Sequence, residues 1–302
     1  MLRAASSAAA APLPSSPAAG AWLLLALGLA ALAALAVGLL LRRWLRERLR
    51  RLRPRRRRLA PRHPVVLAHG LFGFDEIRVA GARHEYFRGV PEILEREGVT
   101  VHRPRVAMAG GVASRAADLA AFVRELPARR VNVIAHSMGG LDARFGIARL
   151  GLDRRVASVV TIGTPHHGTP LADLTASLGE RARIFSALER MGLDVAAFRD
   201  LTTEGMRGFN QEIRDARGVA YASVVGVAPR RGEVHPLLLA SHLWLASRSG
   251  ESDGVVPADS QRWGEVLRTV EADHWAQIGW SRHFDAAQLY LELLRELRGR
   301  GL

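Results

Sequence analysis

Six short apolar segments recur along the chain from residue 63 onward, and the stretches between them have the apolar spacing of helices. The segments are PVVLAH (64–69), VTVHRP (99–104), VNVIAH (131–136), ASVVTIG (157–163), AYASVVG (220–226) and LRTVEA (267–272). Helical spacing is clearest at 116–126, 141–150 and 284–297. Strands that alternate with helices predict an α/β fold, with a mostly parallel sheet covered by helices on both faces.

The third segment runs directly into a helical stretch through a turn of small residues, in VNVIAHSMGGLDARF. Ser137 stands there between Ala135 and Gly139, and such a strand–serine–helix turn is typical of a nucleophile elbow. The turn is sharp, so its flanks must be small, and the start of the helix favours negative charge beside the serine. The alternative is a serine that only caps the helix. We favour Ser137 as the nucleophile of an α/β-hydrolase.

A nucleophilic serine needs a base and an acid that orients the base, and in this fold they follow in the order Ser, acid, His. His274 comes shortly after the last apolar segment. Asp253 lies in GESDGVVPADS (250–260), where Gly254 permits a tight loop that can direct a carboxylate at an imidazole. We therefore predict Asp253 as the acid and His274 as the base. Other acids nearby are Glu251, Asp259, Glu271 and Asp273.

Stabilising the oxyanion of acyl transfer requires two backbone N–H donors. One is expected from Met138, directly after the nucleophile. The other is expected from Leu71, in the loop after the first strand, where Gly70 lets the backbone turn. His69 precedes this turn and is expected to shape the loop by hydrogen bonding, not to act as the base.

His166 and His167, in TIGTPHHGTP (161–170), are expected to line the site. As neighbours their side chains point apart, and zinc-binding spacings are absent from the sequence. The chain has no cysteine, which excludes disulfides and thiolate metal sites. We therefore predict no metal and no cofactor.

The N-terminal 62 residues differ from the rest. Residues 1–20 are rich in Ala, Ser and Pro and are predicted to be disordered. Residues 21–41 are an uncharged apolar run, and a helix of that length would rise about 30 Å and span a bilayer. A secretory signal peptide is the alternative, but its apolar region should be only about 7–15 residues long. The prediction is a transmembrane helix over 21–41.

Residues 42–62 are predicted to be an Arg-rich juxtamembrane linker that contacts anionic headgroups. Eleven arginines and one glutamate lie within 42–58, so most of the chain's net charge of +14 is there. Positive charge after the span predicts a cytoplasmic hydrolase domain, and export with an uncleaved anchor is the alternative. Nucleic acid is a less favoured partner, because Trp44 is the only aromatic residue among these arginines.

The remaining residues, 63–302, are predicted to form one α/β-hydrolase domain. Within it, residues 169–217 mix apolar and charged residues at helical spacing. They are interpreted either as an amphipathic lid over an acyl-binding groove or as helices that simply pack on the domain.

Several motifs in order resemble the bacterial triacylglycerol lipases, from about residue 63 to 279. They are HPVVLAHGLFGFD, VNVIAHSMGGLDARF, TIGTPHHGTPLADL, LTTEGMRGFN, SDGVVP and DHWAQIG. Ala135 replaces the usual first Gly of the elbow, as in one subset of that family. The resemblance implies Ser137 as nucleophile, Asp253 as acid and His274 as base. It also implies Leu71 and Met138 as the oxyanion donors.

In larger members of that family an Asp shortly after the catalytic His helps to bind structural calcium. The corresponding residue here is Ala276, so calcium is not predicted. The expected reaction is hydrolysis of acylglycerols or other lipid carboxylic esters through an acyl-enzyme. A phospholipase, polyester depolymerase, thioesterase or amidase with the same triad stays open, as does a catalytically inactive membrane-tethered interaction protein. The oligomeric state is not predicted.

Overall fold

The structure is a computed structural model of the chain. It describes residues 42, 59–71, 76–79, 82–108, 110–181, 186, 190, 194–229 and 233–302. The chain divides into two compact units, Met1–Arg57 and Arg58–Leu302, and only residue 42 of the first unit is described. The expected disordered segment 1–20, the expected span 21–41 and most of the Arg-rich linker therefore lie outside the described residues.

The predicted localisation in a membrane is wrong. Among the described residues, no helix is long and apolar enough to cross a membrane. This finding contradicts the prediction of a single-pass membrane protein with a cytoplasmic hydrolase domain. That prediction used only the hydropathy of residues 21–41 and the charge that follows them, and these are statistical criteria for a span.

The second unit is built on a six-stranded parallel sheet in the order β4-β1-β5-β6-β7-β8. Each of the six predicted apolar segments supplies one strand, so the predicted fold class is confirmed. The strands are β1 (Val65–Ala68), β4 (Val101–His102), β5 (Val131–His136), β6 (Val156–Ile162), β7 (Ala220–Val227) and β8 (Glu265–Glu271). A two-stranded antiparallel hairpin of β2 (Glu76–Val79) and β3 (Ala82–Glu85) was not predicted, because EIRV and ARHE carry too few apolar residues to indicate a strand.

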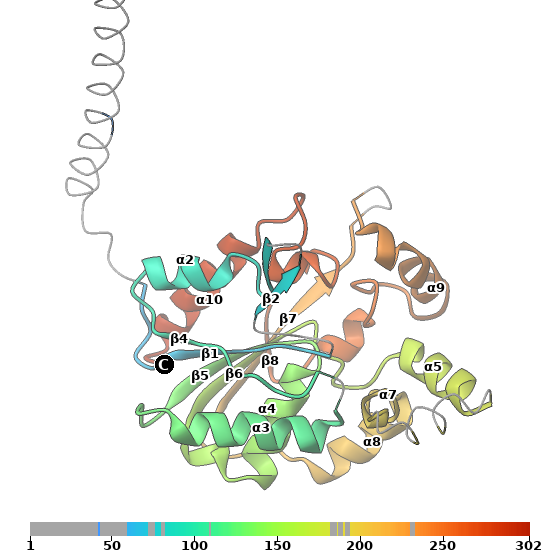
Figure 1. Cartoon of the computed structure of the whole chain (residues 1–302), viewed down its shortest axis with the longest axis horizontal. Helices are drawn as coiled ribbons and strands as arrows, with labels where there is room; N and C mark the ends of the chain where they lie inside the picture. Colours follow the sequence, from blue (N-terminus) through green and yellow to red (C-terminus); the bar gives the residue numbers. More distant parts are fainter. Residues whose placement is uncertain are drawn as a thin grey trace, which may run out of the picture. The chain divides into compact units, whose positions relative to one another are not determined.

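Helices cover both faces of the sheet (Figure 1). On one face lie α2 (Val90–Arg96) and α10 (Ala286–Gly299), and on the other lie α3 (Val112–Glu125) and α4 (Gly139–Arg149). The other described helices are α5 (Pro170–Arg181), α7 (Ala196–Asp200), α8 (Thr203–Glu212) and α9 (Leu239–Ser249). Short 3-10 turns lie at Leu152–Arg154, Pro236–Leu238, Ala258–Gln261 and Ala276–Ile278. The three segments with helical spacing correspond to α3, α4 and α10.

Alternation along β1 shows how the two cores form. Val65 and Leu67 pack with residues of α2 and α10 on one face, whereas Val66 and Ala68 pack with residues of α3 and α4 on the other. Successive side chains of a strand point to opposite faces, so a wholly apolar strand must be covered by helices on both faces of the sheet.

The buried sheet fixes the position of the strand ends. Because all six strands are parallel, the loops after β1, β5, β6 and β8 meet at one edge, where α/β proteins place their ligand sites.

Candidate active site

Ser137 occupies a strained turn between β5 and α4. Its φ is 54°, and among the described residues it is the only non-glycine residue with a positive φ. Its N–H donates to the Ile162 carbonyl at 2.9 Å, and its own carbonyl accepts from Thr164 Oγ1 at 2.7 Å. A left-handed conformation costs a non-glycine residue about 1–2 kcal/mol. Ser137 is not the helix cap, because Met138 holds that position and no side chain caps α4.

Glycines after Ser137 allow three segments to approach one another. A Cβ on Gly139 would lie 2.6 Å from the Ala68 carbonyl oxygen and 2.8 Å from that of His69. One on Gly140 would lie 2.4 Å from Thr164 Oγ1. The absence of these side chains therefore lets the start of α4 contact the loop after β1 and the loop after β6.

His274 and Asp253 form a buried pair. His274 Nδ1 lies 2.7 Å from Asp253 Oδ2, and the His274 N–H donates to the Asp253 carbonyl at 2.8 Å. Asp253 Oδ1 accepts from the backbone N–H groups of Val255 and Val256 at 2.9 and 2.7 Å. Gln277 Nε2 donates to Asp253 Oδ2 at 3.1 Å. Three donors therefore hold the carboxylate in place against the imidazole.

The other acids near this loop have different surroundings. Asp273, directly before the histidine, accepts from the backbone N–H groups of His235, Trp275 and Ala276. The side chain of Asp259 is 99% exposed. Of these carboxylates, Asp253 is the one that the structure places on His274.

Residues next to Ser137 in the structure lie close to the pair, as two contacts show. The ring of His136, the residue before the serine, lies 4.4 Å from the ring of His274 between centroids. Gly163 directly follows Ile162, whose carbonyl oxygen accepts the hydrogen bond from the Ser137 N–H. A Cβ on Gly163 would lie 3.0 Å from Asp253 Oδ2 and 3.2 Å from His274 Nδ1. The end of β6 and the turn that follows it therefore contact both the backbone of Ser137 and the His–Asp pair.

The loop after β1 has two peptide planes held by hydrogen bonds. In the first, the His69 carbonyl accepts from Arg115 at 2.7 Å and the Gly70 N–H donates to Tyr86 Oη at 3.1 Å. In the second, the Gly70 carbonyl accepts from His69 Nδ1 at 3.0 Å. A trans peptide directs its N–H opposite its C=O, so this bond also sets the direction of the Leu71 N–H. His69 thus shapes the loop by hydrogen bonding, as the sequence predicts.

Gly70 is in direct contact with the nucleophile. A Cβ placed on it would lie 2.6 Å from Ser137 Cβ and 3.1 Å from Ser137 Oγ. Within the described part of the chain, the N–H groups of Leu71 and Met138 make no hydrogen bond. Two donors beside the serine are therefore available to a ligand.

A buried ion pair between α3 and α4 also contacts the loop after β1, through the bond of Arg115 to the His69 carbonyl. Arg115 on α3 donates to Asp142 Oδ2 on α4 from Nε at 2.9 Å and lies 2.8 Å from it through Nη2. Burial raises the pKa of Asp142 to about 7, and the charge of Arg115 opposes that rise. Asp142 Oδ1 is buried without a hydrogen-bond partner among the described residues.

The sequence analysis did not predict roles for Gln277, Tyr86 and Arg115. Gln277 lies three residues after the histidine in DHWAQIG, and that spacing was a usable signal. Tyr86 and Arg115 carry no motif, because their roles depend on contacts between distant segments. His166 and His167, expected to line the site, both lie against the ring of Trp263. Within the described ranges, no three His, Asp or Glu side chains converge as metal ligands would.

The sheet order, the turn at Ser137 and the His–Asp pair define an α/β-hydrolase. Residues 63–179 match the family described as the alpha/beta hydrolase fold. A lipase of Bacillus licheniformis in its mature form is 24% identical, with a TM-score of 0.62 over 78% of this chain and 92% of that chain. A metagenomic carboxyl esterase is 22% identical, with a TM-score of 0.66 over 79% of this chain and 76% of that chain. These two likenesses show the fold.

Sequence relatives show the family. A triacylglycerol lipase of Vibrio cholerae is 31% identical, over 68% of this chain and 76% of the relative. Another from Pseudomonas fragi is 28% identical, over 80% of this chain and 98% of the relative. The chain belongs to the bacterial triacylglycerol lipase family, and by class it is a carboxylic ester hydrolase.

Proposed function

We propose that the protein hydrolyses lipid carboxylic esters through an acyl-enzyme on Ser137. The observation that carries the proposal is the 2.7 Å contact of His274 Nδ1 with Asp253 Oδ2, beside a serine in a strained turn. Ser137 Oγ attacks the ester carbonyl while His274 accepts its proton. Asp253 holds the imidazole in the useful tautomer and stabilises the imidazolium that forms.

The N–H groups of Leu71 and Met138 stabilise the tetrahedral oxyanion. His274 then returns its proton to the leaving alcohol. Water attacks the acyl-enzyme with His274 again as base, which releases the acid and restores the serine. Acylglycerols are the proposed substrates, since the relatives from Vibrio cholerae and Pseudomonas fragi are both named triacylglycerol lipases.

A lid over residues 169–217 is part of the proposal. Leu174 and Leu178, one turn apart on α5, are 40% and 54% exposed. Exposed apolar side chains on a helix suit contact with acyl chains. Further along the segment, Asp194 and Asp200 accept from the backbone N–H groups at the start of α3 at 3.1 and 2.7 Å. These bonds tether the segment, and lid opening would break them.

A fluorophosphonate probe tests the nucleophile, because it labels only an activated serine. We expect labelling of the wild type and none of Ser137→Ala. A panel of esters of graded acyl length, run on the same two proteins, then tests the substrate. Hydrolysis that extends to long-chain acylglycerols supports the proposal. Labelling that persists in Ser137→Ala would assign the nucleophile elsewhere.

The lid has a separate test in the double variant Leu174→Ser/Leu178→Ser. We expect unchanged hydrolysis of a soluble short-chain ester and about tenfold slower hydrolysis of an emulsified long-chain ester, since the lost area is apolar. An equal effect on both substrates would contradict a lid that contacts acyl chains.

A further inference from the structure

We propose that Tyr86 and His136 are positioning residues, which form a directed hydrogen-bond relay between the oxyanion loop and the loop of the catalytic base. The inference rests on the triad and oxyanion donors proposed above and adds two residues to that site. Neither touches the reacting atoms, and both act through the backbone of Gly70 and His274.

The relay has three hydrogen bonds. Gly70 N–H donates to Tyr86 Oη at 3.1 Å. Tyr86 Oη lies 2.7 Å from His136 Nδ1, and His136 Nε2 lies 3.0 Å from the His274 carbonyl oxygen. A chain of bonds thus runs from the turn that contacts Ser137 to the backbone of the base.

Both ends of the relay fix its direction. An amide N–H can only donate and a carbonyl oxygen can only accept. His136 Nε2 must therefore carry the proton that binds the His274 carbonyl, and a neutral imidazole then leaves Nδ1 as an acceptor for the Tyr86 hydroxyl. One arrangement of protons satisfies all three bonds.

Burial, together with the neighbouring His274, keeps His136 neutral. Its ring is buried, and burial together with the nearby His274 holds the pKa of His136 well below its ordinary value. A protonated His136 would carry N–H groups on both ring nitrogens. Its ring centroid would also lie 4.4 Å from that of His274, which becomes an imidazolium during catalysis. The neutral tautomer therefore persists while His274 gains and loses its proton.

Tyr86 is held rigidly enough to transmit position. Its carbonyl accepts from Trp280 Nε1 at 2.9 Å, and Arg88 N–H donates to the Ile278 carbonyl at 2.9 Å. Both partners lie in the segment that follows His274. The segment around Tyr86 is thus bound to the base loop through its backbone as well as through the relay.

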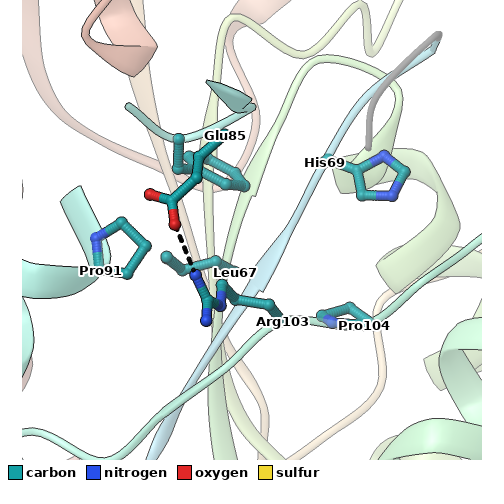
Figure 2. Close-up of a pocket in the computed structure, with 7 residues that line it drawn as sticks. Leu67, His69, Glu85, Pro91, Arg103 and Pro104 are labelled. Atoms are coloured by element: carbon teal, nitrogen blue, oxygen red, sulfur yellow. Dashed lines mark hydrogen bonds and ion pairs between the residues drawn. The ribbon is translucent and has the colours of Figure 1, made fainter. Parts of the chain in front are cut away.

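A small cavity lies beside the oxyanion loop. This cavity has a volume of about 10 Å³. Glu85 and Arg103, two of the residues that line it, form an ion pair of 3.1 Å and are drawn in Figure 2. It is lined by Leu67, His69, Glu85, Phe87, Pro91, Arg103 and Pro104. Such a volume holds about one water molecule. The loop therefore has little room to shift on this side, and its peptide planes depend on the bonds to His69, Arg115 and Tyr86.

The consequence for catalysis follows from the first peptide plane. Its C=O is held by Arg115 and its N–H by Tyr86, so losing Tyr86 Oη frees one end of the plane that precedes the Leu71 donor. Oxyanion stabilisation depends on donor geometry in the transition state, and one donor is worth about 100–1,000-fold in kcat. A residue that only orients the donor should be worth less, about tenfold.

The test compares Tyr86→Phe with Tyr290→Phe, which remove the same hydroxyl group from two tyrosines. Tyr290 is fully buried and its hydroxyl has no hydrogen-bond partner in the described residues, so it is a matched control. We expect kcat of Tyr86→Phe on a short-chain 4-nitrophenyl ester to fall about tenfold with KM within about twofold, because the interaction acts in the transition state. Tyr290→Phe should leave both constants unchanged.

An alkyl boronic acid supplies the second readout, since it forms a tetrahedral anionic adduct with the serine. Its inhibition constant should rise in Tyr86→Phe by about the factor lost from kcat. A merely structural role would lower the unfolding temperature and leave kcat per folded molecule and the inhibition constant unchanged, which would overturn the proposal. Equal losses in Tyr86→Phe and Tyr290→Phe would overturn it too.

A double-mutant cycle with His136→Gln tests the relay as a unit. The Gln amide can still donate to the His274 carbonyl but does not accept from Tyr86 as the imidazole does. If the relay is one unit, Tyr86→Phe causes no further loss of kcat in the His136→Gln background; additive losses would contradict it. If His136→Gln does not fold, the two tyrosine variants decide. Ser137→Ala distinguishes failure of the proposed triad from failure of the relay. Activity in Ser137→Ala would refute the triad. An inactive Ser137→Ala together with a Tyr86→Phe variant of normal activity would refute only the relay.

Discussion

At the scale of single residues, the carboxylate of the site is defined by what surrounds it. Asp253 receives two backbone N–H groups on one oxygen and Gln277 with His274 on the other. These four contacts fix the direction of the carboxylate. Asp259, in the same loop, has an exposed side chain beside Arg262. The two residues share a loop and a chemistry but differ in burial and in partners.

This contrast gives a prediction for Asp253→Asn. The amide cannot hold the imidazole in the useful tautomer, so kcat should fall by about four orders of magnitude. Asp259→Asn is the control and should retain normal kcat. Steady-state kinetics on a soluble ester measure both. Near-normal activity of Asp253→Asn would move the acid's role to another carboxylate.

At the scale of elements, all six predicted segments form strands, and the physical reason is clearest where the sequence is apolar without interruption. The segment VVLA must be buried on both faces, so a parallel central strand is its one suitable place. The elbow was predictable for the same reason, since a strand and a helix joined through Ala, Ser and Gly leave few conformations. The hairpin of β2 and β3 was missed, and so was Tyr86 just after it. Their positions depend on long-range contacts, such as the bond to His136 fifty residues later.

Close packing of elements around the elbow predicts opposite effects of one substitution at two glycines. In Gly139→Ala the new Cβ would meet backbone oxygens at 2.6 and 2.8 Å, which cannot move without parting α4 from the oxyanion loop. We expect at least about a hundredfold loss of kcat, since misplacement near 1 Å can cost that much. Gly208→Ala, inside α8 with nothing within 4 Å, should leave kcat unchanged and stabilise the fold by about 0.5–1 kcal/mol. Kinetics and urea unfolding of both variants check this, and a fully active Gly139→Ala would contradict the packing argument.

At the scale of the whole molecule, the ion pair of Arg115 and Asp142 affects both the stability of the fold and the geometry of the active site. The pair joins α3 to α4 and, through the His69 carbonyl, to the oxyanion loop. Both charges are buried, and a buried pair contributes to stability only when attraction exceeds the cost of desolvation. The raised pKa of Asp142 indicates that desolvation exceeds the attraction to Arg115. The pair therefore orients the loop at some cost in stability at neutral pH.

This cost predicts a dependence of stability on pH. Burial raises the pKa of Asp142 to about 7 from an ordinary value of 3.8, so between these values the folded protein keeps a proton that the unfolded chain has released. The free energy of unfolding then falls as pH rises through this window and is level above it. Asp142→Asn removes the titration while keeping the shape. The wild-type free energy of unfolding minus that of the variant should fall by a few kcal/mol between about pH 4.5 and about pH 8, since one pKa unit corresponds to about 1.4 kcal/mol. Urea unfolding at the two pH values measures it; a difference that is constant, or that rises with pH, would mean that Arg115 lowers the pKa of Asp142 enough to cancel or exceed the effect of burial.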